Sequence, residues 1–128
     1  MKLFFSAKDG GPESKVYGFW LIESKRFGSI ALLRFENGSR EAYHNHAFES
    51  VSWLLKGWLQ EEHFYYGGVE HHYASLCPIR TFRTTFHKVT SVGRSYVLTF
   101  RGPWAKTWFE QTSDGLETLS WGRVILDA

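Results

Sequence analysis

Apolar runs separated by turn residues extend along most of this chain. Val16 to Ile22 is rich in β-branched and aromatic residues, and Ser29 to Phe35 is almost entirely apolar. Runs of this composition and length predict β-strands. Asn37-Gly38 follows directly, and Asn-Gly between two such runs is a strong hairpin signal. We therefore expect residues 40–46 to form a strand that pairs with Ser29 to Phe35.

The alternation around residue 55 predicts which face of the next strand is buried. Most odd positions from Val51 to Leu59 are apolar, whereas the polar Lys56 falls at an even one. We therefore expect the odd-numbered side chains to point inward. Glu49, Glu61 and His63 share that phase unless a bulge intervenes.

Further short strands are predicted in the second half of the chain. They cover Arg80 to Val89, Ser95 to Arg101, Thr107 to Phe109 and Thr118 to Leu126, with turns at Gly67-Gly68, Gly102-Pro103 and Ser113-Asp114-Gly115. No long stretch has a helical period. About nine to eleven short strands in one small unit indicate an all-β fold, a β-sandwich or a closed antiparallel barrel of the jelly-roll type. We expect residues 1–128 to form a single domain.

Composition fits a packed domain and argues against several other classes. Of the 128 residues, 43% are hydrophobic and 18% aromatic, more than a disordered chain carries. The net charge of +2 comes from scattered residues, so we expect no nucleic-acid partner. The apolar runs are too short for a secretory signal or a bilayer span, so we expect a cytoplasmic protein with no membrane partner. Cys77 is the only cysteine, which excludes an intrachain disulfide.

His44-Asn45-His46 is the strongest candidate for chemistry in the sequence. Two imidazoles at positions i and i+2 of an extended segment point to the same face, which places two nitrogen ligands beside one metal ion. His87, far downstream, supplies a third ligand if the sheet curls around the site. A pair of solvated strand histidines is the alternative interpretation, and the flanking glycines favour the metal site over it.

These residues resemble the first motif of the cupin superfamily, G-x5-H-x-H-x3,4-E-x6-G. Gly38 stands at the motif's first glycine, with five residues between it and His44, and Gly57 falls where the closing glycine belongs. Pro78 and His87 resemble the second cupin motif, in which a proline and a histidine lie on two later strands.

The region from Gly38 to Phe109 also resembles a narrower group of small, uncharacterised bacterial and phage cupin-like proteins. The segments that carry this likeness are Ser52 to Glu61, His87-Lys88-Val89, Val97 to Trp104 and Trp108-Phe109. The resemblance implies a small antiparallel jelly roll around a metal site.

One departure from the cupin motif concerns its glutamate. Ser50 occupies that position, and Glu49 stands one residue earlier, where a one-residue shift turns a side chain to the opposite face. The apolar odd positions nevertheless favour an inward Glu49, so it is kept as a candidate fourth ligand beside a three-histidine site. Glu61 is a further candidate, either as a ligand or as a hydrogen-bond acceptor for a ligating imidazole.

Other polar and aromatic residues carry weaker signals. His63 shares the buried phase and competes as an extra ligand, whereas His71-His72, beside a glycine turn, is expected in a solvated loop. Candidate anchors for an anionic substrate are Arg34, Arg80, Arg83 and Arg101, for which plain surface charges are the common alternative. Aromatic residues that could line a pocket or simply fill the core are Trp53, Phe86, Trp104 and Trp108.

The ligand set suits one divalent transition metal, such as Fe, Mn, Ni or Zn. Three or four protein ligands leave open positions for water, O2 or a substrate oxygen. The leading hypothesis is a metal-dependent enzyme acting on a small organic molecule, with an Fe(II) dioxygenase ahead of an isomerase and no residue identified as acid or base. The alternative is a non-catalytic cupin that binds a small ligand or a structural metal. Because cupins commonly pair through edge strands, a homodimer would cover such edges here.

Overall fold

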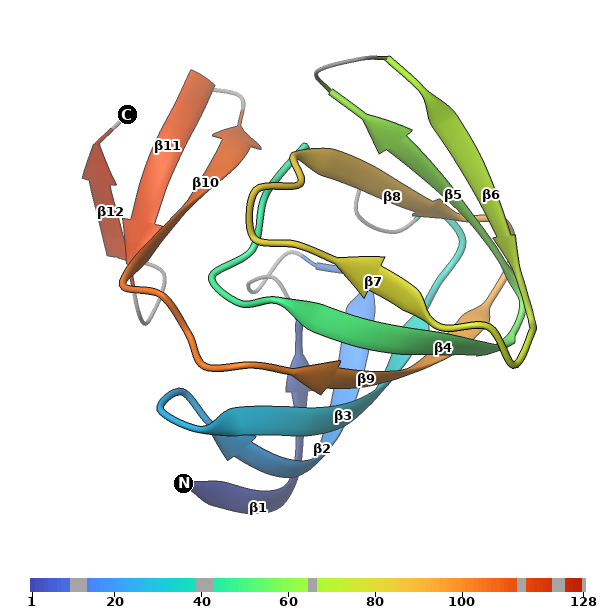
Figure 1. Cartoon of the computed structure of the whole chain (residues 1–128), viewed down its shortest axis with the longest axis horizontal. Helices are drawn as coiled ribbons and strands as arrows, with labels where there is room; N and C mark the ends of the chain where they lie inside the picture. The colour runs from blue at the N-terminus through green and yellow to red at the C-terminus, as the bar shows by residue number, and fades with distance from the viewer. Residues whose placement is uncertain (10–13, 39–42, 65–66, 113–114, 121–123, 128) are drawn as a thin grey trace.

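The computed structural model describes residues 1–9, 14–38, 43–64, 67–112, 115–120 and 124–127. These residues form β-strands and no helix, which confirms the all-β prediction (Figure 1). The strands are β1 (Lys2–Lys8), β2 (Val16–Ser24), β3 (Gly28–Phe35), β4 (Ser50–Lys56), β5 (Trp58–His63), β6 (Val69–Tyr73), β7 (Ile79–Thr81), β8 (His87–Ser91), β9 (Ser95–Arg101), β10 (Thr107–Thr112), β11 (Gly115–Ser120) and β12 (Val124–Asp127).

The strands form two antiparallel layers. One layer is a six-stranded sheet with the order β1-β2-β3-β9-β4-β7. The other consists of two three-stranded sheets, β6-β5-β8 and β10-β11-β12. His44 joins these two sheets, because its backbone pairs with His87 of β8 and with Glu110 of β10. His44, a residue of the candidate metal motif, therefore also links the two sheets of the second layer.

The main core lies between the layers. Its buried apolar residues are Val16, Trp20, Ala31, Leu33, Phe35, Leu54, Leu59 and Val97, and only Leu59 among them comes from the second layer. A smaller buried cluster contains Ala47, Phe48, Trp108 and Leu119, with Trp104 packed against it. Removing these large side chains from water is the main favourable contribution to folding.

The expected hairpin at Asn37-Gly38 is wrong. β3 pairs with β2 along one edge and with β9 along the other, so Leu33 lies opposite both Gly18 and Val97. No edge of β3 is left for the predicted partner strand, whose residues 40–42 lie outside the described residues. In a jelly roll, pairing joins strands that are distant in sequence, and a local turn signal does not reveal such partners.

The chain changes both sheet and phase at Gly57, between β4 and β5. In β4 the even positions point inward, since Leu54 is 1% exposed and Leu55 is 53% exposed. In β5 the odd positions point inward, and Leu59 is buried. The register of β4 shifts at its end, and Gly57 has a φ of 107°. This irregularity reverses the alternation, so the predicted odd phase is right for β5 and wrong for β4.

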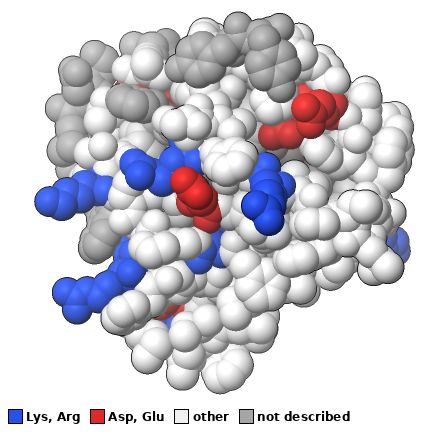
Figure 2. Space-filling view, viewed as in Figure 1, with Lys and Arg blue, Asp and Glu red and all other residues white. Residues whose placement is uncertain are grey.

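On the face shown in Figure 2, several Lys and Arg side chains lie near one another in the middle and on the left, with an acidic side chain among them. Among the described residues, no helix is long and apolar enough to cross a membrane.

Candidate metal centre

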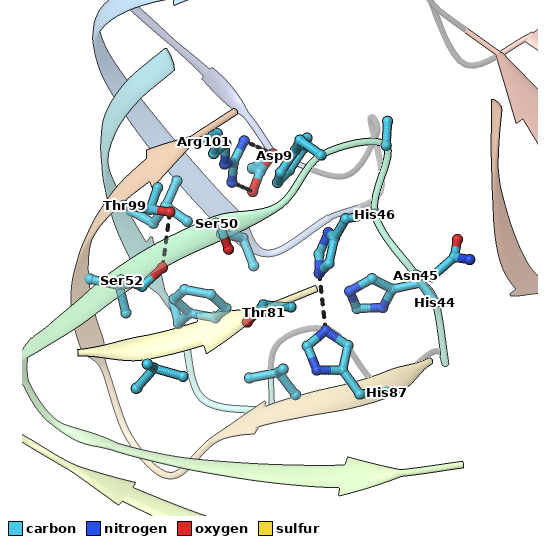
Figure 3. A pocket seen from close by; sticks show the side chains of 18 of the residues that line it. Asp9, His44, Asn45, His46, Ser50, Ser52, Thr81, His87, Thr99 and Arg101 are labelled. Atoms are coloured by element: carbon cyan, nitrogen blue, oxygen red, sulfur yellow. Dashed lines mark hydrogen bonds and ion pairs between the residues drawn. The ribbon is translucent and has the colours of Figure 1, made fainter. Parts of the chain in front are cut away.

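The imidazoles of His44, His46 and His87 converge beside the inner face of the second layer (Figure 3). The ring centroids are 4.7 Å apart for His44 and His46, 4.9 Å for His44 and His87, and 5.1 Å for His46 and His87. One ring nitrogen from each lies within 4.8 Å of the others, and the Nε2 atoms of His46 and His87 are 3.0 Å apart. The structure thus brings together the three histidines that the sequence singled out.

Backbone pairing places His44 and His87 beside each other. The His44 N–H donates to the His87 carbonyl at 2.8 Å, and the His87 N–H donates to the His44 carbonyl at 2.9 Å. Residues that exchange both bonds in an antiparallel pair carry their side chains on the same face of the sheet. His46 also points to this face, whereas the side chain of Asn45 points away from the three rings (Figure 3). His44 and His46 therefore share a face as alternate residues of a strand do, although their segment belongs to no regular strand.

Glu61 of β5 contacts His87 at Nδ1, the ring nitrogen that does not face His46. Its Oε2 accepts a short hydrogen bond from Nδ1 of His87, and both side chains are buried. A proton fixed on Nδ1 leaves the Nε2 lone pair of His87 free to face His46. Glu61 lies outside the three-nitrogen group. Of the two roles considered for it from the sequence, the geometry therefore fits the hydrogen-bond acceptor.

The surroundings of Glu61 favour its charged form. Burial raises the pKa of the Glu61 carboxyl, but hydrogen bonds from His72 and His87 and the charges of His87 and His63 outweigh burial and hold that pKa well below its usual range. The hydrogen bond to Glu61 in turn raises the pKa of His72, against the effect of burial and with help from the charges of Glu61 and Glu70. Glu61 is therefore a carboxylate that accepts hydrogen bonds from two imidazoles.

Glu49 is not part of this centre, which corrects the expectation from strand phase. Its side chain is exposed, and its backbone carbonyl accepts a hydrogen bond from the Gly102 N–H at 2.8 Å. Because β4 has the opposite phase from β5, Ser50 lines the cavity instead. The position of the cupin glutamate thus does face the cavity, but it carries a hydroxyl, and the carboxylate is absent.

The expectation of a solvated loop is wrong for His72. It lies on β6, pairs with β5 and turns inward, where its Nε2 is 3.0 Å from Oε1 of Glu61. His71 faces the other way and accepts a hydrogen bond from Nε1 of Trp58 at 3.1 Å. Glu70 and His72, two residues apart just after a glycine turn, carry the same alternating signal as His44 and His46 and could have revealed this strand.

A cavity of about 520 Å³ adjoins the three imidazoles. Aromatic and aliphatic core residues make up much of its wall, and its small hydroxyl side chains are Ser50, Ser52, Thr81 and Thr99. Trp104 and Trp108 also line it. Trp53 lies elsewhere, with its ring against Phe100. The cavity therefore combines an apolar body with a few polar groups, as small-molecule sites do.

Arg101 is the one candidate anchor that reaches this cavity. Its Nη1 and Nη2 donate to the Asp9 carboxylate at 3.3 and 2.7 Å, and its guanidinium lies 4.5 Å from the ring centroid of Phe48. Its Nε and Nε1 of Trp104 are buried with no hydrogen-bond partner among the described residues. The cavity lining therefore includes two N–H donors, and the charge of Arg101 is balanced by Asp9. The other candidates are Arg34, which pairs with Glu36, and the exposed Arg80 and Arg83.

The donor set fits a divalent first-row metal ion. It consists of three imidazole nitrogens, and the lone pair of one is oriented by a buried carboxylate. Neutral imidazoles bind Fe, Mn, Ni and Zn, and a cavity beside three protein ligands leaves room for further ligands. The group lies where the segment of His44 pairs with β8, so the backbone itself holds these donors.

Neither a protein-family model nor a curated protein matches this sequence. Solved structures do match. The polyketide cyclase RemF from Streptomyces resistomycificus is 13% identical with a TM-score of 0.65, over 77% of this chain and 73% of that one. A sugar phosphate isomerase of the cupin superfamily from Silicibacter pomeroyi is 12% identical with a TM-score of 0.61, over 100% and 98% of the two chains.

The Fe(II) form of HppE is 12% identical with a TM-score of 0.61, over 77% of this chain and 56% of that one. Several further matches are described as cupins or as double-stranded β-helix proteins. At these identities the likeness concerns the fold. This chain therefore has the double-stranded β-helix fold that these cupin structures share.

Proposed function

We propose that this protein binds one divalent transition metal through His44, His46 and His87 and acts on a small organic molecule in the adjoining cavity. The observation that carries the proposal is the convergence of three nitrogen donors beside a cavity of about 520 Å³. Ser50, at the position of the cupin glutamate, supplies no fourth carboxylate ligand. Three protein ligands leave open positions for exogenous molecules.

Oxidation by O2 is the reaction that we propose. A bound Fe(II) with open positions would supply the O2 chemistry, and the protein would bind and orient the organic substrate. The fold likeness to HppE, whose solved structure is described as its Fe(II) form, supports iron as the metal. Glu61 would keep the Nε2 lone pair of His87 directed at the ion.

The cavity wall favours a substrate with an apolar body and a hydrogen-bond acceptor. Arg101 Nε and Trp104 Nε1 are the buried donors that such an acceptor would meet. Asp9 already balances the charge of Arg101. A carbonyl or hydroxyl oxygen therefore fits this wall better than a multiply charged group such as a phosphate.

A non-catalytic, ligand-binding cupin is the second candidate. One observation favours it: the carboxylate of Asp9 is paired with Arg101, and the carboxylate of Glu61 accepts hydrogen bonds from His72 and His87. Neither carboxylate is therefore placed to take a proton from a substrate.

Nitric oxide binding to the iron-loaded protein distinguishes these candidates from a closed structural site. The full chain is stripped with a chelator, reloaded with Fe(II) without oxygen and exposed to nitric oxide. We expect the EPR signal of a half-integer-spin iron nitrosyl, because an open position accepts the probe. Bound iron without this signal would contradict an open site. A nitrosyl signal without O2 consumption, across a panel of small aromatic and aliphatic ketones and phenols, would favour the ligand-binding cupin.

We also propose a homodimer. Among the described residues β1 pairs only with β2, and it exposes Leu3 and Phe4. Pairing with a second copy would cover this edge. Light scattering on the eluting protein is expected to give twice the chain mass of 14.9 kDa, and a mass equal to that of one chain would contradict the proposal.

A further inference from the structure

A second group of metal-ligating side chains surrounds Glu61, next to the three imidazoles. Glu61 and His63 are two residues apart on β5, and Glu70 and His72 are two residues apart on β6. Glu61 lies directly opposite Glu70 in the β5–β6 register. Because alternate residues of a strand share a face, and directly opposed residues do too, all four side chains project from one face of this strand pair.

One donor atom from each of Glu61, His63 and Glu70 lies within 4.8 Å of the others, and His72 lies beside this group of three. His63 Nε2 is 3.5 Å from Glu61 Oε1 and 3.6 Å from Glu70 Oε1. His72 Nε2 is 3.0 Å from Glu61 Oε1 and 3.9 Å from Glu70 Oε2. Ligands bound tetrahedrally to zinc at about 2.0–2.1 Å are about 3.3 Å from one another. The four observed separations fall on both sides of this value.

Glu61 can serve this group without releasing His87, because its two oxygens face different partners. Oε2 accepts the hydrogen bond from His87, whereas Oε1 is the oxygen nearest to His63 and His72. Glu61, His63 and His72 are largely buried, and Glu70 is 55% exposed at the rim. The rim position of Glu70 leaves a route by which an ion enters from solvent.

We propose that Glu61, His63 and Glu70, with His72 as the fourth ligand, bind a second divalent cation, for which zinc is the best match. Imidazole nitrogens and carboxylate oxygens in a four-coordinate shell are typical zinc ligands. The competing interpretation is an ion-pair network in which protonated histidines take the place of the cation. The second site goes beyond the proposed function, because none of the three histidines of the first centre belongs to it.

Zinc stoichiometry tests the second site. The full chain is stripped with a chelator and dialysed against zinc alone, and the zinc bound per chain is measured together with each dissociation constant. We expect two ions in the wild-type chain, one in His63→Gln, and a dissociation constant for one ion that rises at least tenfold in Glu70→Gln. His71→Gln is the matched control and is expected to keep both ions, because His71 is exposed on the opposite face of β6.

Comparison with His46→Gln separates the two sites. One wild-type ion that is lost in His46→Gln but kept in His63→Gln overturns the second site and leaves the first standing. One wild-type ion that is lost in His63→Gln but kept in His46→Gln supports the second site and contradicts the proposed function. Two ions with unchanged affinities in both His63→Gln and Glu70→Gln overturn the second site. Because Glu70 is exposed, its variant keeps the test readable even if His63→Gln fails to fold.

Discussion

His44 and His87 exchange two backbone hydrogen bonds and present their rings on the same face of the second layer. Both residues are only 3% exposed. Two of the three donors are thus positioned by the pairing of the main chain, and the third follows two residues later at His46. The pairing that completes the second layer is therefore the same pairing that assembles the candidate metal centre.

Replacing Glu61 with Gln is expected to weaken metal binding at the three-histidine centre. The amide still offers an acceptor to His87, but the negative charge that supports the imidazole is lost. We expect an affinity loss of about 10–100-fold, the usual effect of removing such a partner. Competition with a coloured chelator measures this affinity. The ion that belongs to the three-histidine centre is identified as the one that His46→Gln fails to bind.

Glu62→Gln is the control for this experiment. Glu62 is the next residue of β5 and lies on its other face, where it pairs with Lys88 at 3.3 Å. Equal affinities in the Glu61→Gln and Glu62→Gln variants would contradict the role assigned to Glu61.

The bond between Glu61 and His72 predicts a pH window for the stability of the metal-free protein. The folded pKa of Glu61 is lowered, so its contribution is present above the ordinary value of 4.5 and is lost as the pH falls below it. The folded pKa of His72 is raised, so its contribution is present below the ordinary value of 6.5 and is lost as the pH rises through the raised value. The stability difference between wild type and His72→Gln should therefore be largest between pH 4.5 and 6.5. Urea midpoints over a pH series measure it, and a difference that does not vary with pH would be inconsistent with this bond.

Gly57→Ala is expected to destabilise the fold at the point where the chain changes sheets. Gly57 has a φ of 107°, and a Cβ there would lie 2.2 Å from Ser95 Oγ and 2.7 Å from Ser95 Cα. The backbone strain alone costs about 1–3 kcal/mol, and the clash adds to it. Gly93→Ala is the matched control, because Gly93 has a φ of 75° but nothing within 4 Å of the added Cβ. Denaturant unfolding should rank Gly57→Ala as the less stable variant, and the reverse order would refute the close contact.

Asp9→Asn is expected to lower the free energy of unfolding more than the double variant Asp9→Asn/Arg101→Met, which removes both charges. Arg101 has a side chain that is 6% exposed and loses its counter-charge in this variant. Leaving a buried charge unpaired costs about 3–5 kcal/mol, and the partial exposure of Asp9 places the expected value at the lower end. The double variant Asp9→Asn/Arg101→Met should recover part of this loss in denaturant unfolding. A double variant less stable than Asp9→Asn would show that the pair itself stabilises the fold.

The fold class could be predicted from the sequence because its signal is local. Runs such as Ser29 to Phe35 carry strand composition in themselves, and the structure confirms the all-β, cupin-like prediction. The partners of those runs could not be predicted from turn chemistry. β3 pairs with β9, which lies far along the chain, and the Asn37-Gly38 signal pointed to a neighbour instead.

In the candidate site, too, short-range features could be predicted from the sequence and features that depend on strand pairing could not. The spacing of His44 and His46 was enough to place them together, since alternation over two residues is short-range. The phase expected for Glu49 came from the apolar odd positions Val51 and Trp53. In β4 the even positions Ser50 and Ser52 line the cavity and Trp53 packs against Phe100, so apolar character did not mark the inward face. The inward face of His72 was missed because the pairing of β6 with β5 makes this segment a strand, whereas its sequence suggested a loop.

The metal content of the freshly purified chain tests the central claim most directly. Wild type, His46→Gln and His87→Gln are purified together under reducing, metal-replete conditions, with His71→Gln as the control, and the metal per chain is measured by elemental analysis. We predict that wild type and His71→Gln each hold one more ion per chain than His46→Gln and His87→Gln do. Equal metal content in all four proteins would contradict the three-histidine centre.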